Sequence, residues 1–287
     1  MIKKFSILVT MAFLALLISC SDKPNPAKDF TYTTTDDGSG IRITAYRAKK
    51  KNVIIPETIE GLPVKEVVSF DNFNKSGSYY SKLFKKRLTA NWNTFIKKVV
   101  FPDCVEIIPA FPGEPEVLTE GFYTALEYVK LPASLKQGHV FTPAWPGDTE
   151  YHYWHDPETK EKLPVGIDEF GMDFRNLASL KTIIIPEGIK YIDNLYGTSL
   201  KSVSLPSTIR FVGYSAFAER YGDYPCKSLS SITIPDSVSR ICFSANAYTN
   251  SSWNPTDTPE QNNCFAGTNF NLATQNKLRQ LGYDGEF

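Results

Sequence analysis

The sequence predicts a mainly β fold, a right-handed solenoid of about six irregular units with short parallel strands, an N-terminal β-hairpin cap and a short C-terminal helix. Two observations predict it. First, six short apolar runs each end in a proline, which closes a strand because it has no N–H to donate. Second, the residues around each proline repeat one apolar pattern. The six runs are residues 53–56, 99–102, 129–132, 183–186, 203–206 and 232–235.

The pattern places apolar residues at positions −6, −3, −1, +3 and +6 relative to each proline. Of these 30 positions 28 are apolar, with Lys50 and Gly138 as the exceptions, whereas a composition that is 42% hydrophobic would give about 13. Positions −3 and −1 alternate and therefore share one face of a short strand. One unit cannot bury its apolar stripe alone, so the units must stack on a common core.

Residues 199–217 closely resemble the consensus of BspA-like leucine-rich-repeat proteins, a family of bacterial surface proteins. Residues 227–235 repeat the same motif, and residues 40–64 are similar to the first unit of that family. The resemblance covers roughly residues 30–265 and implies a leucine-rich-repeat-like solenoid. It also implies attachment to host extracellular-matrix proteins or to other bacteria.

Both ends of the solenoid need a cap, because terminal units otherwise expose apolar faces and strand edges. Residues 30–35 and 41–46 flank the turn-forming segment 36–40 and predict a hairpin. Residues 271–280 predict a short helix that ends at Gly282, with Leu272, Leu278 and Leu281 on its apolar side. We therefore expect one domain over residues 30–287, with insertions near 71–93 and 139–174.

The N-terminal segment predicts export. Lys3 and Lys4 precede an apolar run over residues 5–18, which is shorter than the roughly 20 residues of a transmembrane helix. Residues 17–20 resemble the lipobox of bacterial lipoproteins. The resemblance implies that residues 1–19 are a signal peptide, that Cys20 is acylated, and that residues 20–29 form a lipidated tether. Ser21 at the next position favours the outer membrane, and we expect the cell surface, with the periplasmic face as the alternative.

Composition excludes some partners. The 31 basic and 31 acidic side chains give no net charge, which argues against nucleic acid because phosphate binding needs a basic excess. The short basic runs at 49–51 and 85–87 are typical of solvated loops. No nucleophile elbow, phosphate loop or Cys–His pair is found in the sequence, so we expect a protein that is not an enzyme and uses no cofactor. We also expect a monomer.

The cysteines that follow Cys20 leave alternatives open. Cys104, Cys226, Cys242 and Cys264 allow three pairings in an oxidising compartment. A bridge among the last three is one interpretation, and buried free thiols are the other, which we prefer. Their spacing does not indicate zinc.

The insertion near 139–174 holds the candidate ligand-binding residues, a group rich in aromatic and imidazole side chains: Trp145, Tyr151, His152, Tyr153, Trp154 and His155. One interpretation is an aromatic platform for sugars or a partner protein, since Tyr and Trp dominate binding hot spots. A metal site of His152, His155 and Asp156 is a second. The third, which we prefer, is a β-hairpin around residues 156–160 that packs on the solenoid. Tyr79, Tyr80 and Trp92 present a weaker case in the earlier insertion.

The sequence thus predicts a lipid-anchored surface protein that binds rather than catalyses. An adhesin that recognises host or bacterial surface proteins is the preferred hypothesis. The alternatives are a glycan-binding accessory lipoprotein of a nutrient-uptake system and a structural envelope protein. Fold alone does not identify the ligand.

Overall fold

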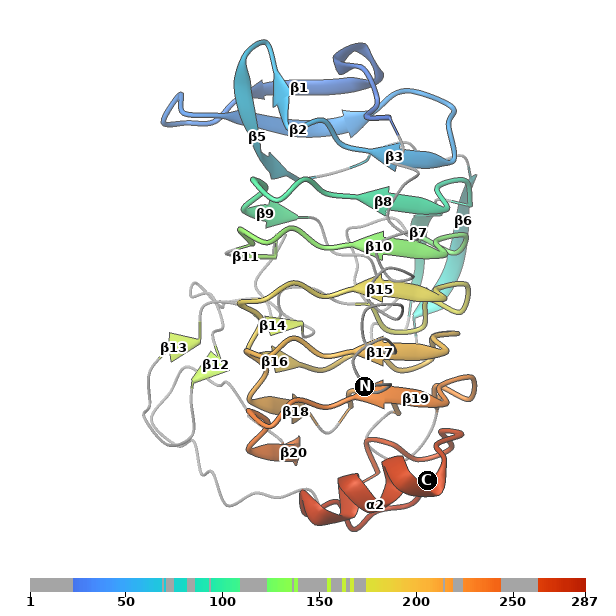
Figure 1. Ribbon diagram of the computed structural model, residues 1–287. Coiled ribbons are helices and arrows are strands. Elements are labelled where there is room, and N and C mark those ends of the chain that lie inside the picture. The colour runs from blue at the N-terminus through green and yellow to red at the C-terminus, as the bar shows by residue number, and fades with distance from the viewer. Residues whose placement is uncertain are drawn as a thin grey trace, which may run out of the picture.

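The computed structural model describes residues 23–68, 70, 75–81, 86–92, 94–108, 123–135, 137–138, 154–155, 162–163, 166–167, 174–213, 215–218, 224–243 and 263–287 (Figure 1). Within these residues the chain forms a solenoid of short strands, which confirms the predicted mainly β repeat fold. None of the helices in this part of the chain is long and apolar enough to cross a membrane.

One side of the solenoid is a stack of three-residue strands, and each strand ends two residues before one of the six prolines. These strands are β3 (Asn52–Ile54), β8 (Lys98–Val100), β10 (Tyr128–Lys130), β15 (Thr182–Ile184), β17 (Ser202–Ser204) and β19 (Ser231–Thr233). The first four pair in parallel in the order β3-β8-β10-β15, and β17 pairs in parallel with β19. We call this side the proline-side stack.

A second stack lies on the opposite side of the units (Figure 1). Its strands are β5 (Leu62–Val67), β9 (Ile107–Ile108), β11 (Gln137–Gly138), β14 (Gly166–Ile167), β16 (Tyr191–Ile192), β18 (Phe211–Gly213) and β20 (Arg240–Phe243). All its neighbours pair in parallel, in the runs β5-β9-β11 and β14-β16-β18-β20. Five of these strands, β5, β9, β16, β18 and β20, hold the apolar position +6, so the chain after each of these turns forms part of a second sheet rather than a loop.

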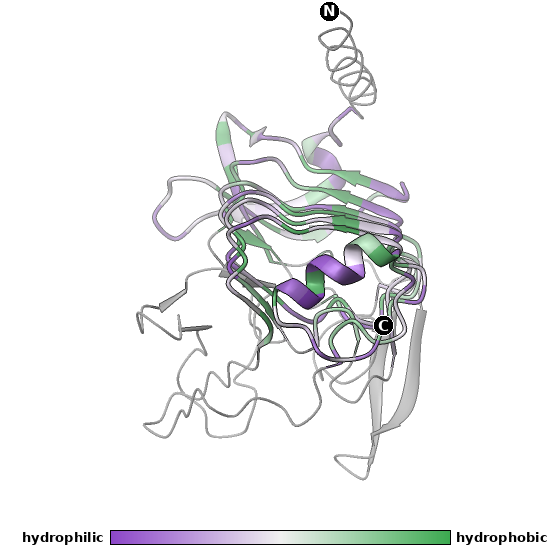
Figure 2. Cartoon of the chain, turned by 60° about the horizontal axis from the view of Figure 1, so that its bottom comes forward, coloured by the Kyte–Doolittle hydropathy of each residue, from purple (hydrophilic) through white to green (hydrophobic). Residues whose placement is uncertain are grey.

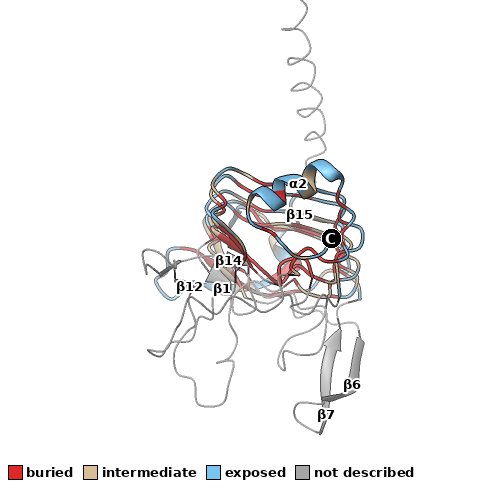
Figure 3. Ribbon diagram, turned by 90° about the horizontal axis from the view of Figure 1, so that it is seen from below, coloured by how far each residue is buried: buried red, intermediate tan, exposed pale blue. Residues whose placement is uncertain are grey.

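The predicted inward positions form the core between the two stacks. Of the 28 apolar positions, all except Leu62 and Ile241 are buried, and those two are partly buried against the same core. Figure 3 shows the consequence: buried residues line the inside of the superposed units and exposed residues lie at their rim. The repeat pattern was therefore a correct prediction of the core.

The N-terminal hairpin is confirmed. Strand β1 (Phe30–Thr34) pairs antiparallel with β2 (Ile41–Tyr46), and β2 continues in parallel onto β5, which itself pairs antiparallel with β4 (Thr58–Ile59). The packed chain begins before the hairpin, with the 3-10 helix η1 (Ala27–Asp29) and the buried side chain of Asn25, which is 4% exposed. The part of the predicted tether that the structure describes is thus held on the first unit from Asn25 onward.

The C-terminal helix α2 (Leu272–Gln280) crosses the other end of the stack (Figures 1 and 2). Its start is set by Asn271, whose side chain accepts a hydrogen bond from the Thr274 N–H, as an N-cap residue does. Leu278 is buried, but Leu272 is 71% exposed, so the prediction that Leu272 faces the core was wrong. Six residues rotate the helix by about 600°, which leaves Leu272 about 120° away from the direction of Leu278.

Two further hairpins lie in the predicted insertions. Strand β6 (Lys75–Ser81) pairs antiparallel with β7 (Lys86–Trp92) along seven residue pairs. Strand β12 (Trp154–His155) pairs antiparallel with β13 (Lys162–Leu163), which confirms the hairpin predicted around residues 156–160.

A disulfide joins Cys242 to Cys264, with a Cα–Cα distance of 5.5 Å. Cys104 and Cys226 are free thiols, half-buried and buried respectively. The preference for free thiols was therefore wrong for Cys242 and Cys264 and right for the other two. Disulfide formation needs this close approach, and the sequence does not reveal which pair achieves it.

Candidate binding face

The outward side chains of the proline-side stack form the broadest regular surface of the described chain. They occupy positions −4 and −2 before each proline, between the buried positions −3 and −1. In order along the stack they are Asn52 and Ile54, Lys98 and Val100, Tyr128 and Lys130, Thr182 and Ile184, Ser202 and Ser204, and Ser231 and Thr233. All except Ile54 are exposed or half-buried. We call this surface the outward face.

The middle of the outward face combines apolar and cationic groups. Strand register sets Lys98 beside Tyr128, and the Lys98 ammonium lies 4.8 Å from the centroid of the Tyr128 ring. At position −2, Val100, Lys130 and Ile184 lie side by side on the three paired strands β8, β10 and β15. The Ile184 side chain, at the end of β15, is 44% exposed and is one of the few large apolar side chains of the described residues that are exposed.

The C-terminal part of the outward face is different. Strands β17 and β19 present only hydroxyl side chains there, from Ser202, Ser204, Ser231 and Thr233, and all four are exposed. Small hydroxyl groups supply little apolar area for a partner to bury. The part of the face best suited to binding is therefore the middle, around Tyr128 and Ile184.

Charged residues line the corner beside this face. Glu127 lies between two lysines of neighbouring units: one carboxylate oxygen is 2.5 Å from Lys97 Nζ, and the other is 2.9 Å from Lys181 Nζ. The hydrogen bond from Lys97, followed by that from Lys181, lowers the pKa of Glu127 to about 2. Lys130 Nζ is 3.2 Å from Asp103 Oδ1. These exposed pairs fix side chains at the rim more than they stabilise the fold.

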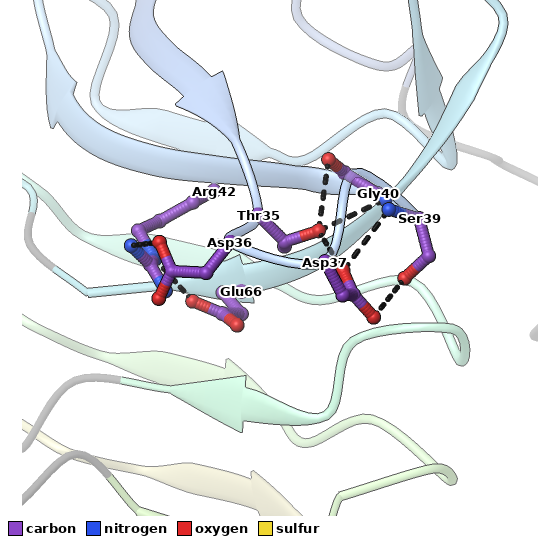
Figure 4. Close-up of polar contacts among 7 residues, drawn as sticks. All are labelled: Thr35, Asp36, Asp37, Ser39, Gly40, Arg42 and Glu66. Atoms are coloured by element: carbon purple, nitrogen blue, oxygen red, sulfur yellow. Dashed lines mark hydrogen bonds and ion pairs between the residues drawn. The ribbon is translucent and has the colours of Figure 1, made fainter.

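The turn of the N-terminal hairpin holds two adjacent carboxylates, Asp36 and Asp37. Figure 4 shows that both accept hydrogen bonds from nearby residues of the hairpin. Asp37 accepts hydrogen bonds from the Thr35 hydroxyl at 2.6 Å and from the Ser39 hydroxyl at 2.6 Å. The Ser39 hydroxyl is the main cause that holds the pKa of Asp37 well below its usual range. Such side-chain contacts to nearby donors are typical of a fixed turn.

Beside that turn, Arg42 joins two carboxylates. Its guanidinium donates two hydrogen bonds of 3.1 Å to Asp36 and another to Glu66 on β5 (Figure 4). These bonds, first that to Glu66, raise the pKa of Arg42. Within the described residues no group of three His, Cys, Asp or Glu side chains could hold a metal ion. We therefore assign the turn a structural role.

A buried polar pair lies in the second stack. The Tyr191 hydroxyl donates a hydrogen bond of 2.7 Å to Asp193 Oδ2, and the Asn194 N–H donates one of 3.0 Å to Asp193 Oδ1. A Cβ atom at Gly213 would overlap both the Tyr191 hydroxyl and the Asp193 carboxylate. Only glycine fits at this point of β18, so the pair is a packing feature of the repeat rather than an accessible site.

The ligand-binding residues that the sequence predicts lie mostly outside the described residues: Trp145, Tyr151, His152 and Tyr153. Trp154 and His155 form β12, where Trp154 pairs with Leu163 and His155 with Lys162. Tyr79, Tyr80 and Trp92 stand on β6 and β7. Neither the aromatic platform nor the metal site is thereby tested, and both remain hypotheses, as does acylation of Cys20.

The outward face was not singled out by the sequence. The signal that could have found it lies at positions −4 and −2. Both positions are polar in the last two units, whereas each of the first four units has one apolar or aromatic residue there: Ile54, Val100, Tyr128 and Ile184. Apolar residues at outward positions are typical of a surface that contacts something else.

Comparisons with known proteins agree with this architecture. The model of the BspA type leucine-rich repeat region matches residues 171–283 in six copies. Repeats of this kind are typically non-enzymatic and mediate protein interactions. No curated protein sequence matches the chain.

Three solved structures are similar at low identity. A leucine-rich repeat protein from T. pallidum is 20% identical, with a TM-score of 0.44, over 92% of this chain and 99% of that one. One from Bacteroides ovatus is 20% identical, with a TM-score of 0.40, over 73% of this chain and 41% of that one. A leucine-rich cell surface protein from Faecalibacterium prausnitzii is 22% identical, with a TM-score of 0.29, over 82% of this chain and 60% of that one.

The family match and the described units coincide at the C-terminal half of the stack, where β15, β17 and β19 repeat one strand–proline pattern. The strands β3, β8 and β10 continue that pattern in parallel register toward the N-terminus. Residues 171–283 are therefore a BspA-type leucine-rich repeat region, at the C-terminal end of a longer stack of similar units.

Proposed function

We propose that this protein is a lipid-anchored cell-surface adhesin that binds a protein ligand through the middle of its outward face. The observation that carries the proposal is the exposed Ile184, which lies in register with Lys130 and Val100 on paired strands, beside the Lys98–Tyr128 pair. Tyrosine is enriched in the energetic hot spots of protein interfaces, and the neighbouring aliphatic side chains supply apolar area that a protein partner can bury. The lipobox-like residues before and at Cys20 support the anchor and the surface location.

The binding test uses residues 21–287, which keep every residue that the structure describes. We expect saturable binding to at least one protein of a panel of host extracellular-matrix proteins, or to whole cells of another bacterium. Ile184→Asp should weaken that binding at least about tenfold, because a carboxylate would be buried without a partner. Thr233→Asp, at the same offset of another unit and also exposed, should leave it unchanged.

A glycan array run beside the protein panel separates the alternative. The motivation for it is the β12–β13 hairpin, which pairs Trp154 with Leu163 inside the aromatic insertion. Saturable sugar binding that Trp154→Ala abolishes and Ile184→Asp leaves unchanged would replace the adhesin with a glycan-binding accessory lipoprotein. Absence of binding in both the protein panel and the glycan array would favour a structural envelope protein.

The location has its own test. Labelling with an alkyne-bearing fatty acid should mark the wild type and not Cys20→Ala. Protease treatment of intact cells should remove the protein from the wild type. Complete protection in intact cells, with digestion after lysis, would place the protein on the periplasmic face and exclude an adhesin.

A further inference from the structure

A hollow of about 450 Å³ lies at the N-terminal end of the proline-side stack. It is formed where the chain before η1 meets the first two units. Four of the residues that line it are lysines: Lys23, Lys50, Lys51 and Lys97. Asn25 and Ile54 line it as well. A volume of this size is in the range of sites that take a small molecule or a lipid headgroup.

The charges around the hollow are only partly compensated. Lys50 Nζ is 3.0 Å from Asp29 Oδ2, and Lys97 Nζ is 2.5 Å from a Glu127 carboxylate oxygen. Among the described residues, no acidic side chain forms an ion pair with Lys23 or Lys51. Two lysines without an ion pair among the described residues therefore line one hollow, and that arrangement favours an anion.

Asn25, two residues after Lys23, is hydrogen-bonded to β3. The Asn25 N–H donates to the Ile54 carbonyl oxygen at 2.7 Å, and the Ile54 N–H donates to Asn25 Oδ1 at 2.8 Å. Lys51 precedes β3, whose backbone carries the other half of this contact. The fold thus brings Lys23 and Lys51 to the same end of the solenoid, where both line the hollow, although the sequence indicates only a solvated basic run at residues 49–51.

Chain length places this hollow close to the predicted anchor. Lys23 is the third residue after Cys20, and a fully extended chain spans at most about 3.5 Å per residue, or about 10 Å over these three steps. An acylated Cys20 lies at the headgroup layer, so the backbone at Lys23 must lie within about one Debye length, 8–10 Å, of it. At that range a lysine interacts with membrane phosphates even at physiological salt.

From this geometry we infer that the hollow binds the phosphate of anionic lipid headgroups in the membrane that holds Cys20. This inference rests on the proposed function for the anchor. Lys23 and Lys51 contact the phosphate, and Lys50 and Lys97, held by Asp29 and Glu127, line the sides. The N-terminal end of the solenoid then rests on the membrane, and α2 at the opposite end points away from it (Figure 1).

The test measures sedimentation of residues 21–287 with vesicles, so that binding does not require the lipid anchor. Vesicles of phosphatidylcholine with about one third phosphatidylglycerol should bind the protein, and pure phosphatidylcholine vesicles should not. Lys23→Ala combined with Lys51→Ala should weaken binding by about tenfold or more. The matched control is Lys201→Ala with Lys227→Ala, which removes the same charge from two exposed lysines in other units and should change binding less than twofold.

Three results would overturn the inference: equal binding to both kinds of vesicle, equal losses from the two double variants, or specific displacement by free phosphate. The last is measured with inorganic phosphate against chloride at the same ionic strength, and it would assign the hollow to a soluble phosphate ligand instead. Failure of the anchor is seen separately, as absence of fatty-acid label on Cys20. Vesicle binding without that label would leave the hollow intact and remove only the anchor.

Discussion

Asn25 and Ile54 are joined by two backbone-directed hydrogen bonds that close the first edge of the proline-side stack. The Asn25 N–H donates to the Ile54 carbonyl oxygen, and Asn25 Oδ1 accepts from the Ile54 N–H, at 2.7 and 2.8 Å. Strand β3 is the edge of its four-stranded sheet, so these groups would otherwise be open to pairing with another chain. A single asparagine thus substitutes for part of a neighbouring strand.

The first prediction concerns that contact. Asn25→Ala should lower the free energy of unfolding by about 1–3 kcal/mol, because the Ile54 N–H and the Asp29 carboxylate each lose a partner in a buried site. Urea unfolding followed by circular dichroism measures it. The exposed Asn52→Ala on β3 serves as control and should change stability by less than about 0.5 kcal/mol. If both variants lowered the free energy of unfolding by the same small amount, the hydrogen bonds of Asn25 to the edge strand β3 would not contribute to stability.

The second prediction concerns Gly213. Gly213→Ala should destabilise the protein by about 1–3 kcal/mol, since the new methyl group overlaps the Tyr191 hydroxyl and the Asp193 carboxylate. The exposed Ser204→Ala, on β17 of the opposite stack, is the control. Combining Gly213→Ala with Tyr191→Phe should cost less than the sum of the single changes, because the phenylalanine removes one of the overlapping atoms. Strict additivity would show that the overlap is not the cause.

Sequence periodicity predicted the core of this fold well, for a physical reason. A stacked unit must point the same offsets inward at every rung, so Val53, Val99, Val129, Ile183, Val203 and Ile232 all reach the same interior. The same reasoning does not reach Asn25, whose partners lie 4, 21 and 29 residues away and follow no period. Contacts of that kind depend on the finished fold.

The outward face shows the same limit in another form. Alternation of apolar and polar residues predicts which side of a strand faces solvent. Residues 182–186 do not alternate in this way, because Ile183, Ile184 and Ile185 are all apolar, so the sequence does not reveal that Ile184 is the exposed one. The Cys242–Cys264 bridge was undecided among three pairings until the fold brought the two Cα atoms to 5.5 Å. Trp154 was predicted to lie on a hairpin, and the paired backbone of β12 and β13 agrees.

The third prediction concerns the disulfide. Cys264→Ala should lower the free energy of unfolding by about 3 kcal/mol, because the bridge closes a loop between residues 22 apart and restricts the unfolded chain. Cys104→Ala, at a half-buried free thiol, is the control. Alkylation of residues 21–287, unfolded without reductant, should modify two thiols per chain. Four modified thiols would show that the bridge does not form.

The fourth prediction concerns pH. The hydrogen bond from Lys97 and that from Lys181 lower the pKa of Glu127 from 4.5 to about 2 in the folded protein. Because the folded pKa is the lower one, the unfolded chain binds the proton first as pH falls. The stability that Glu127 contributes is therefore complete above about pH 4.5 and is lost as pH falls toward 2.

Glu127→Gln removes this pH-dependent contribution and keeps the size of the side chain. Its melting temperature should lie below that of the wild type at pH 7, and the difference should shrink as pH falls from about 4.5 toward 2. High salt at pH 7 should shrink the difference too, because the ion pairs are exposed and screened. Glu57→Gln, an exposed carboxyl with no ion pair among the described residues, is the control. A gap between Glu127→Gln and the wild type that stays constant with pH would show that the two lysines do not hold the carboxylate in its charged form.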